Sequence, residues 1–400
     1  MSKNTVVLAY SGGLDTSVAI QWLQENYGLE VVTVTVNAGQ DDDFPKIKET
    51  ALKSGAKEAY IIEAQIEFVN EFILPALKAN ALYERHYPLI SSLTRPLIAK
   101  HVVEVAEKIG SSYVAHGCTG KGNDQVRFEI SFAALNPGLK IIAPLRESKM
   151  SREEAIEYAE EKNIPIEVSK KSPYSIDENI WGRAIECGVL EDAWREPPEE
   201  IYKLTKNPTS LDTEPEYVEI TFKDGKPVEL NNKKIELIEL IRKIGEIAGS
   251  HGFGRIDMIE NRFVGIKSRE IYEAPSALSL IIAHQDLEKL TMEKDLYHFK
   301  EMVESRFAEL IYNGYWHSPL REALDSFINK SQENTTGTVR LKFFKGNCSV
   351  VGRKSEKSLY DLSLASYEKG KDSFSHDSAK GFIDIIKLPI ALWAKKKKKV

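Results

Sequence analysis

The first 165 residues repeat one pattern, in which a short apolar run precedes a longer stretch with apolar residues every three or four positions. Apolar runs at 5–10 and 31–36 predict buried strands. Between them, one helix face is predicted to carry Leu14, Val18, Trp22 and Leu23. We therefore expect a βαβ unit with parallel strands and a right-handed crossover over the first forty residues.

The same alternation continues along this part of the chain. Strands are predicted at 59–62, 113–115 and 140–143, and helices at 44–54, at 66–77, from 94 onward, and in a segment that ends near 163. Thr94-Arg95-Pro96 is typical of a helix start with proline in its first turn, and Ser151 with Glu154 of a capping box. The pattern predicts an α/β fold with a doubly wound parallel sheet. Its ligands bind beyond the carboxyl ends of the strands, where Ser11, Gln40 and Gly117 follow predicted strands.

The pattern changes after about residue 170, where prolines become frequent. Residues 217–222 alternate as a half-buried strand before a turn at 223–226. Helical spacing follows at 234–248 and over most of 286–312, and two further strands are predicted at 337–344 and 348–352. This part is predicted to be an α+β domain. The predicted division is a first domain at 1–170, a second at 171–365 and a C-terminal segment at 366–400.

The C-terminal segment contains an amphipathic pattern at 375–394, interrupted at Pro389. A helix with that many apolar side chains docks on its own domain or on a neighbouring subunit. Five lysines follow at 395–399. Contact with nucleic acid or anionic lipid is one interpretation of such a run, but on an acidic chain we expect a solvated tail.

Composition narrows the class of protein. Apolar residues make up 42% and charged residues 28% of the 400, and the formal net charge is −6. These values are typical of a globular protein without the basic surplus that nucleic acid requires, so we expect no nucleic-acid partner. Cys118, Cys187 and Cys348 lack zinc-site spacing. With neither a leader pattern nor an apolar run of bilayer length, we expect a cytoplasmic protein without a membrane partner.

The stretch from Ala9 to Ser17 reads AYSGGLDTS and joins the first predicted strand to the first predicted helix. Adjacent glycines let the backbone approach a ligand, and the first N–H groups of the helix favour phosphate. The stretch is neither a Walker A loop nor a dinucleotide fingerprint. It resembles the pyrophosphate-binding loop of the N-type ATP pyrophosphatases. The alternative is an ordinary turn in which serine and aspartate cap the helix.

Residues 116–128 read HGCTGKGNDQVRF and follow a buried predicted strand. Three glycines within six residues free the backbone, and Thr119, Asn123, Asp124 and Arg127 supply polar groups of both charge signs. The alternative interpretation is a polar turn whose ions pair with each other.

Together these stretches resemble the paired motifs of the argininosuccinate synthase family. The resemblance continues through SIDEN at 175–179, GRIDMIENRFVGIKSREIYE at 254–273 and GFI at 381–383. It implies a PP-loop nucleotide domain, a synthetase domain and a C-terminal oligomerisation helix in a homotetramer. It also implies a ligase of arginine biosynthesis that condenses citrulline with aspartate, using ATP and Mg²⁺, to give argininosuccinate, AMP and pyrophosphate. The same reaction belongs to the urea cycle.

The resemblance also implies three sets of binding residues. The ATP set is Ala9, Tyr10, Ser11, Gly12, Gly13, Leu14, Asp15, Thr16, Ser17, Val36 and Gly117. The aspartate set is Thr119, Asn123 and Asp124, and the citrulline set is Tyr87, Ser92, Asn123, Arg127, Ser175, Ala184, Glu260 and Tyr272. Many members carry a serine where this chain has Ala184, which leaves only backbone contact there. The sequence assigns neither metal ligands nor a base for the aspartate amine, although His116 and Asp124 lie nearby in sequence.

Several alternatives remain open at this point. Glu260 is also interpretable as a surface ion pair with Arg262 or Arg269, and Tyr87 and Tyr272 as core aromatic residues. The alternatives among enzymes are other ATP pyrophosphatases. A tRNA-modifying thiolase would need a catalytic cysteine pair and a basic surface, and an amidotransferase would need a glutaminase domain. The alternative outside enzymes is a non-catalytic adenine-nucleotide sensor.

Overall fold

The computed structural model describes residues 4–120, 122–165, 173–368 and 373–397. Lys121, Lys398, Lys399 and the predicted domain boundary at 170/171 lie outside the described residues. The chain forms two compact units, Met1–Lys357 and Ser358–Val400, each of which is described by itself.

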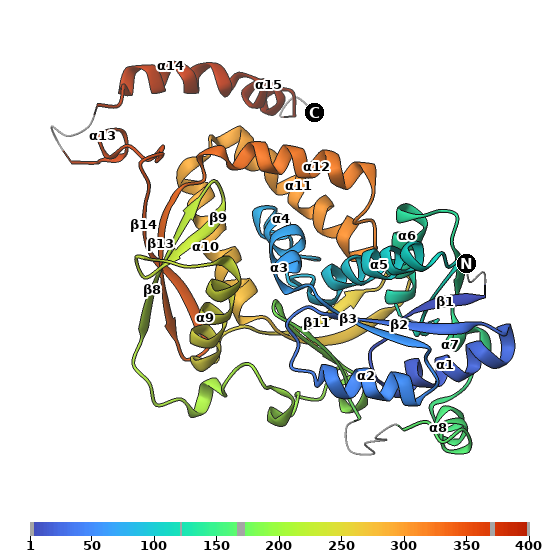
Figure 1. Ribbon diagram of the computed structural model, residues 1–400. Helices are drawn as coiled ribbons and strands as arrows, with labels where there is room; N and C mark the ends of the chain where they lie inside the picture. Colours follow the sequence, from blue (N-terminus) through green and yellow to red (C-terminus); the bar gives the residue numbers. More distant parts are fainter. Residues whose placement is uncertain (1–3, 121, 166–172, 369–372, 398–400) are drawn as a thin grey trace. The chain divides into compact units, whose positions relative to one another are not determined.

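A parallel sheet forms the core of the first half of the larger unit. Its described strands are β1 (Thr5–Ala9), β2 (Glu30–Asn37), β3 (Glu58–Glu63), β4 (Tyr113–His116) and β5 (Lys140–Ile142), in the order β3-β2-β1-β4-β5. Neighbouring strands are all parallel. This order and direction confirm the predicted doubly wound sheet (Figure 1).

Helices cover both faces of this sheet. They are α1 (Leu14–Tyr27), α2 (Phe44–Lys53), α3 (Gln65–Glu67), the π-helical turn η1 (Phe68–Ile73), α4 (Leu74–Lys78), α5 (Ile90–Ile109), α6 (Asp124–Leu135), α7 (Pro144–Ser148) and α8 (Arg152–Glu161). Val7 of β1 belongs to the same core as Leu97 of α5. The next residue, Leu8, belongs to a second core with Ile20 of α1. Successive side chains of β1 therefore pack into the hydrophobic cores on opposite faces of the sheet.

Helix α5 begins four residues before the predicted start, so Pro96 lies inside it rather than in its first turn. Ile90 and Leu93 are fully buried ahead of the proline. Burial of these side chains extends the helix where local sequence preference predicts a start at Thr94. The capping box of Ser151 and Glu154 is confirmed at the start of α8.

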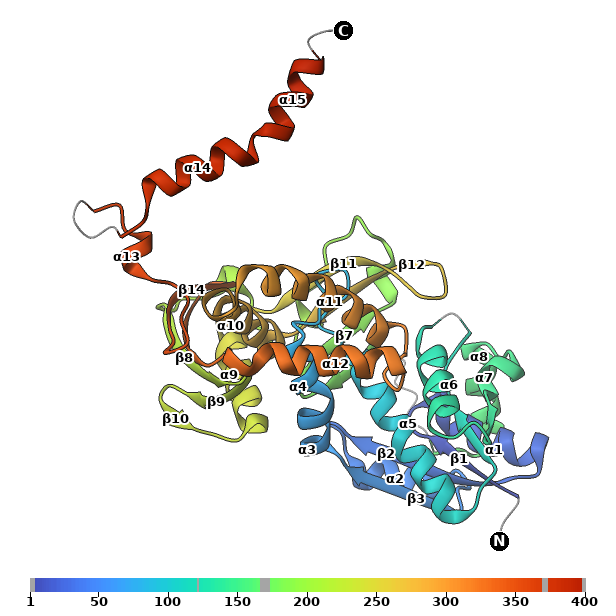
Figure 2. The same cartoon turned by 90° about the horizontal axis from the view of Figure 1, so that it is seen from above.

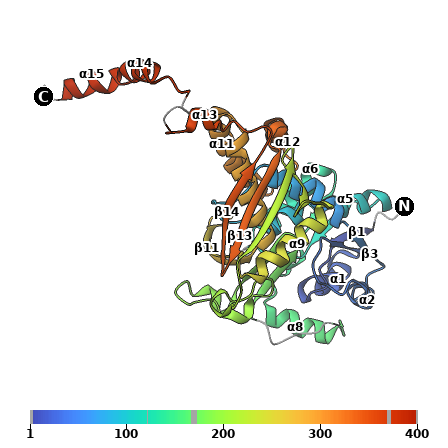
Figure 3. The ribbon, with the colours of Figure 1, turned by 90° about the vertical axis from the view of Figure 1, so that its left-hand side faces the viewer.

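The second half of the larger unit contains two antiparallel sheets. Its described strands are β6 (Ser175–Asn179), β7 (Gly182–Glu186), β8 (Glu216–Lys223), β9 (Lys226–Leu230), β10 (Lys233–Lys234), β11 (Arg255–Asn261), β12 (Lys267–Glu273), β13 (Gly337–Phe344) and β14 (Asn347–Lys354). One sheet has the order β10-β9-β8-β13-β14 and the other β11-β12-β7-β6. The predicted turn at 223–226 joins β8 to β9, with Asp224 and Gly225 at positive φ. Figure 3 shows β8, β13 and β14 side by side.

Helices and short turns connect these strands. They are α9 (Leu237–Ser250), α10 (Pro275–Thr291), α11 (Lys294–Tyr312), α12 (Pro319–Ser331) and the 3₁₀ turns η2 (Gly188–Glu191), η3 (Glu199–Ile201), η4 (Pro208–Ser210) and η5 (Gln332–Asn334). One of the helices, α10, contacts strands of both sheets. The helical stretch predicted at 286–312 is two helices. Met292 is extended and ends α10, and Glu293 caps α11 by accepting from the N–H groups of Asp295 and Leu296. Helix α9 begins at Leu237, since β10 occupies the first predicted helical position.

The hairpin of β6 and β7 joins the two halves near the carboxyl end of β2. The N–H of Ile180 donates to the carbonyl of Ala38 at 3.0 Å. On the other side, Asn179 Nδ2 donates to the carbonyl of Ile90, and Trp181 Nε1 to that of Pro88, both at 2.9 Å. Helix α5 contacts β1 and β2 as well as β6 and β7. Figure 2 shows α5 beside β1 and β2. These contacts place the four-stranded sheet beside the carboxyl ends of the parallel strands.

The smaller unit contains α13 (Leu362–Ala365), α14 (His376–Ile386) and α15 (Leu388–Lys397). The helix breaks at Lys387, which confirms the interruption predicted near Pro389, because a proline removes one N–H and its ring opposes the carbonyl four residues earlier. Its large apolar side chains are exposed, among them Phe382, Ile385, Ile386, Leu388, Leu392 and Trp393. Over the described ranges, none of the helices combines the length and apolar character of a membrane span.

Gly39 is a test of the contact between the halves. Its φ is +98°, and a Cβ there would lie 2.7 Å from Cβ of Ile180. Gly265 has a similar φ of +91° but open space around it. Because both positions strain an alanine by roughly 1–3 kcal/mol and only Gly39 adds a clash, we expect Gly39→Ala to lower the Tm further than Gly265→Ala. Equal Tm values in differential scanning fluorimetry would contradict this packing.

Candidate functional site

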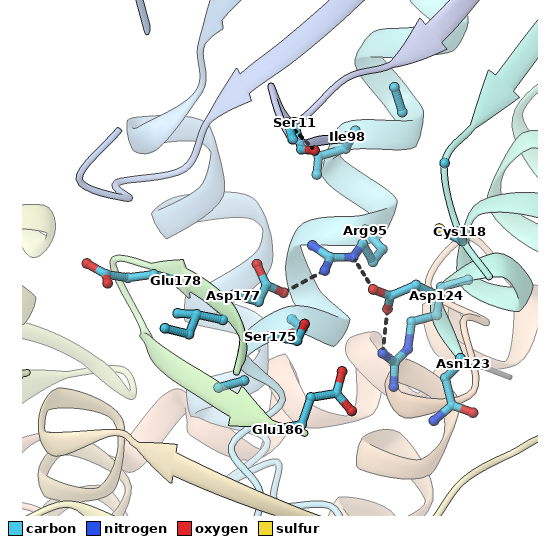
Figure 4. A pocket seen from close by; sticks show the side chains of 18 of the residues that line it. Ser11, Arg95, Ile98, Cys118, Asn123, Asp124, Ser175, Asp177, Glu178 and Glu186 are labelled. Carbon is cyan, nitrogen blue, oxygen red and sulfur yellow. Dashed lines mark hydrogen bonds and ion pairs between the residues drawn. The ribbon is translucent and has the colours of Figure 1, made fainter. Parts of the chain in front are cut away.

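A cavity of about 760 Å³ lies between the carboxyl ends of β1, β2 and β4 and the sheet that contains β6, β7, β11 and β12. The sequence-predicted residues that line it are Ala9, Tyr10, Ser11, Gly13, Thr16, Val36, Tyr87, Gly117, Thr119, Asn123, Asp124, Arg127, Ser175, Ala184, Glu260 and Tyr272. All four long motifs thus meet in one chamber, part of which Figure 4 shows.

The glycine turn after β1 leaves the start of α1 uncapped. Gly13 is the N-cap residue, and the described side chains supply no cap hydrogen bond. Gly12 has a φ of +81°, which favours glycine, and a Cβ at Gly117 would lie 2.6 Å from Cγ2 of Thr16. The alternative in which serine and aspartate cap this helix is therefore wrong. An uncapped N-terminus in a cavity has the donors and the dipole that attract an anion.

Five predicted residues do not line this cavity. They are Gly12, Leu14, Asp15, Ser17 and Ser92. Asp15 lines a separate cavity of about 150 Å³ together with Trp22 and Arg152; burial raises the pKa of its carboxyl, and Arg152 lowers it. Ser17 contacts the hydroxyl of Tyr10 at 2.8 Å, and Ser92 is fully buried in α5. A direct role of these side chains in ligand binding stays a prediction.

A chain of alternating charges crosses the cavity (Figure 4). Arg95 of α5 donates to Asp177 of β6 at 2.6 Å and to Asp124 of α6 at 2.8 Å, and Asp124 accepts from Arg127 at 2.8 Å. Burial alone would raise the pKa of Asp124, but the two guanidinium groups lower it to about 2. The second motif is therefore more than a turn whose ions pair locally, because its aspartate also pairs with Arg95 of α5, which in turn pairs with Asp177 of β6.

Glu260 is buried, with 4% of its surface exposed. Its carboxylate accepts from the hydroxyl of Tyr272 at 2.7 Å and from that of Tyr312 at 2.5 Å. Burial raises its pKa, and the two tyrosine hydroxyls lower it. Arg262 and Arg269 pair with other carboxylates, so the alternative of a surface ion pair at Glu260 is wrong.

Tyr87 and Tyr272 lie between the core and the cavity. Their rings stack with centroids 4.2 Å apart, and the Tyr87 hydroxyl accepts from the N–H of Ser91. Both line the cavity while almost fully buried. They therefore combine the core role and the site role that sequence reasoning treated as alternatives. Beside Tyr272, Ala184 occupies the paired position on β7 and also lines the cavity.

Sequence reasoning missed several charged residues that line the cavity, among them Arg95, Glu186, Arg262 and Glu270. Arg262 bonds to both Glu186 and Glu270. Burial and the neighbouring carboxylates of Glu186 and Glu260 raise the pKa of Glu270 to about 8. Period-two alternation along β12 would have found Glu270, because it shares a strand face with Tyr272. Arg95 gave no such signal, since its partners are distant in sequence.

The lining of this cavity is acidic. Among the described residues it contains eight carboxyl groups and three guanidinium groups. The carboxyl groups are those of Asp41, Asp42, Asp124, Asp177, Glu178, Glu186, Glu260 and Glu270. The described histidine, cysteine, aspartate and glutamate side chains nevertheless form no cluster of three that is placed to hold a metal ion.

The fold and the site define an α/β protein with one cavity at the carboxyl ends of a parallel sheet, where an uncapped helix start suited to an anion faces the buried carboxylate of Glu260. Two family models match the chain, the arginosuccinate synthase N-terminal HUP domain at residues 5–165 and the arginosuccinate synthase C-terminal domain at 174–393. The chain belongs to the argininosuccinate synthase family, as its sequence motifs predict.

Similar curated proteins carry the family name. The argininosuccinate synthase of Oceanobacillus iheyensis is 56% identical over 97% of this chain and 93% of its own length. Those of Dictyoglomus turgidum and Symbiobacterium thermophilum are 56% and 55% identical, over 99% and 98% of both chains respectively. Among solved structures, the U34-tRNA thiolase NcsA of Methanococcus maripaludis aligns over 44% of this chain and 62% of its own, at 18% identity and a TM-score of 0.28. That last likeness is too low to bear on function.

Glu270 predicts a pH dependence of stability. Its pKa is about 8 in the folded chain and near 4.3 in an unfolded one. Between these values the folded state retains a proton that the unfolded state has lost, so wild-type stability falls as pH rises, by at most about 1.4 kcal/mol per pH unit. Glu270→Gln removes this loss, and we expect its Tm relative to wild type to increase steadily from pH 5 to pH 8.

The matched control is Glu356→Gln, since Glu356 is exposed and outside the cavity. Its Tm relative to wild type should not change with pH. A difference between Glu270→Gln and wild type that stays constant from pH 5 to pH 8 would show that Glu270 is ionised throughout.

Proposed function

We propose that this chain is a ligase that condenses citrulline with aspartate, with ATP converted to AMP and pyrophosphate, as a step of arginine biosynthesis. Membership of the argininosuccinate synthase family supports the proposal. The observation that carries it is the single cavity that joins an uncapped glycine turn, suited to phosphate, to the carboxylate of Glu260 and the guanidinium of Arg127, suited to an amino acid.

The proposed reaction begins at the uncapped end of α1. The ureido oxygen of citrulline attacks the α-phosphorus of ATP, and the bond to the β-phosphate breaks with pyrophosphate leaving along the turn at Ser11 and Gly13. The product is citrulline adenylated on its oxygen. This step is needed because a urea carbon is a poor electrophile whose oxygen does not leave by itself.

The second step uses the amine of aspartate. It attacks the activated carbon, loses a proton, and expels AMP with the electron pair of the broken C–O bond. In this proposal Thr119, Asn123 and Asp124 hold aspartate, and Val36 and Gly117 contact the nucleotide. Catalysis then consists mainly of positioning three ligands in one chamber and of stabilising charge on the leaving pyrophosphate.

Citrulline is held at its amino-acid end in this proposal. Arg127 binds the carboxylate and Glu260 the α-ammonium group. The guanidinium of Arg127 is already fixed by Asp124 and by the carbonyl of Tyr312, to which its Nε donates at 2.8 Å. Ser175 and Ala184 line the wall beside them. Because these groups are oriented before the ligand arrives, binding costs little rearrangement of the protein.

Mg²⁺ fits the chemistry of this site. The acidic lining repels a bare triphosphate, and a divalent cation offsets that repulsion. No described cluster of three side chains forms a metal cage, so phosphate oxygens and water would hold the ion, with carboxylates such as Asp41 or Asp42 at the edge of the cavity as further oxygen ligands. When bound, Mg²⁺ supplies charge neutralisation on the phosphates.

We further propose a homotetramer in the cytoplasm. The exposed apolar side chains of α14 and α15 support assembly, because apolar surface of this extent on a helix is stabilised by burial against a partner. The three described cysteines are free thiols, as a reducing compartment favours. Light scattering on the purified chain measures the oligomeric state directly.

Product analysis tests the proposed reaction. ATP labelled in the adenine ring is incubated with the protein, Mg²⁺, citrulline and aspartate. We expect labelled AMP and an equal amount of pyrophosphate, both dependent on the two amino acids. A nucleotide sensor would bind ATP without forming AMP, and release of ADP with orthophosphate would contradict the proposed bond cleavage.

Arg127→Ala tests the citrulline site. Because the guanidinium binds citrulline and not ATP in this proposal, we expect the KM for citrulline to rise at least about tenfold while the KM for ATP stays within about twofold. Steady-state kinetics with each substrate varied in turn measures both. The control is Arg353→Ala on β14, whose guanidinium pairs with Asp286 away from the cavity. Equal increases for citrulline and ATP would contradict the assignment.

A further inference from the structure

Tyr312 is the last residue of α11 and is fully buried. It does not line the cavity, and no motif of the sequence points to it. It nevertheless contacts four of the residues proposed to bind citrulline. We propose that Tyr312 is a positioning residue that fixes Tyr87, Asn123, Arg127 and Glu260 relative to one another; this inference rests on the proposed function.

The polar atoms of Tyr312 contact three of these residues. Its hydroxyl donates to Oε1 of Glu260 at 2.5 Å and accepts from Nδ2 of Asn123 at 2.8 Å. Its carbonyl accepts from Nε of Arg127 at 2.8 Å. Asn123 precedes α6, Arg127 lies within α6, and Glu260 lies on β11. One residue thus connects both proposed ends of the citrulline amino-acid group to a third element, α11.

The ring of Tyr312 is held as firmly as its polar atoms. It stacks on Tyr83 with centroids 3.5 Å apart and meets Tyr87 edge to face at 6.2 Å. Cζ of Arg127 lies 4.9 Å from its centroid. A change of the χ1 rotamer would break the hydroxyl contacts and the stack together, so the position of the hydroxyl is determined by packing as well as by hydrogen bonds.

The backbone after Tyr312 explains how α11 reaches α6. Gly314 has a φ of +86°, and a Cβ there would lie 2.7 Å from Cα of Arg127. Only glycine allows this approach. The close contact brings the carbonyl of Tyr312 within reach of Arg127, although the two residues are far apart in sequence.

The hydroxyl of Tyr312 also influences the charge of Glu260. Burial raises the pKa of this carboxyl, and hydrogen bonds from Tyr312 and Tyr272 lower it. The other charged or titratable groups that face Glu260 are Arg127 and Arg262, which lower its pKa further, and Tyr83, Tyr87 and Glu270. Binding of an α-ammonium group requires ionised Glu260. Loss of one hydroxyl donor therefore moves its ionisation to higher pH.

Tyr312→Phe tests the inference, because it keeps the ring contacts and the carbonyl and removes only the hydroxyl. We expect kcat/KM for citrulline to fall about tenfold. In the pH profile of kcat/KM for citrulline, the acidic limb should move to higher pH, because Glu260 then accepts one tyrosine hydrogen bond instead of two. The KM for ATP should stay within about twofold, and that for aspartate should change less than that for citrulline, because Asn123 is only partly released.

The matched control is Tyr297→Phe. Tyr297 lies at the start of the same helix, and its hydroxyl also bonds to a carboxylate, that of Glu301. Tyr297→Phe removes a tyrosine–carboxylate hydrogen bond of the same helix away from the cavity, and we expect unchanged kinetics for all three substrates. A citrulline kcat/KM and an acidic limb that are the same in Tyr312→Phe and in wild type would overturn the inference, as would equal losses for citrulline and ATP.

The experiment also distinguishes two further outcomes, failure of the proposed function and failure of the variant to fold. If wild type neither forms AMP with both amino acids nor binds citrulline in calorimetry, the proposed function and this inference are both wrong. If Tyr312→Phe does not fold, Tyr83→Leu is used instead, because Tyr83 is only half-buried and lies outside the cavity. Removing its stack on Tyr312 should lower kcat/KM for citrulline about threefold without changing that for ATP, and an unchanged citrulline value would overturn the inference.

Discussion

The site depends on the ion pairs that hold the partly buried Asp124 between two guanidinium groups. Arg95, Asp124 and Arg127 come from two helices of the nucleotide half, and Asp177 extends the chain of charges to the hairpin of the other half. An isolated charge in such a position would cost several kcal/mol, so each member stabilises the others only while all are in place. The same geometry that satisfies these charges fixes the distance between the glycine turn and the four-stranded sheet.

The two sides of the cavity consist of different groups. The phosphate side consists of backbone, with an uncapped helix start and two glycines that permit close approach. The amino-acid side consists of side chains on rigid strands and helices, where Tyr272 and Tyr312 orient Glu260. In the proposed function, N–H groups that carry no net charge bind the polyanion, and a carboxylate and a guanidinium bind the zwitterion. This division suits a reaction whose protein contribution is mainly positioning.

The sequence predicted the parallel sheet well because its strands are short apolar runs separated by helical spacing. It also predicted many of the residues that line the cavity, since glycines and mixed charges are concentrated in short motifs. It did not predict the start of α5, where burial of Ile90 outweighs the local preference around Pro96. Nor did it find Arg95 or Tyr312, because their roles arise from partners 82 and 52 residues away. The domain boundary, the Mg²⁺ requirement and the tetramer stay predictions.

The hairpin of β6 and β7 has a consequence for the folding of the chain during its synthesis. During synthesis the nucleotide half leaves the ribosome first, with Arg95 lacking Asp177 and the carbonyls of Pro88 and Ile90 lacking their donors. The chamber gains its second wall only after β12 emerges, and its last anchor only after residue 314. A chain that ends before residue 314 lacks part of the structure around the cavity, so the proposed activity requires most of the larger unit.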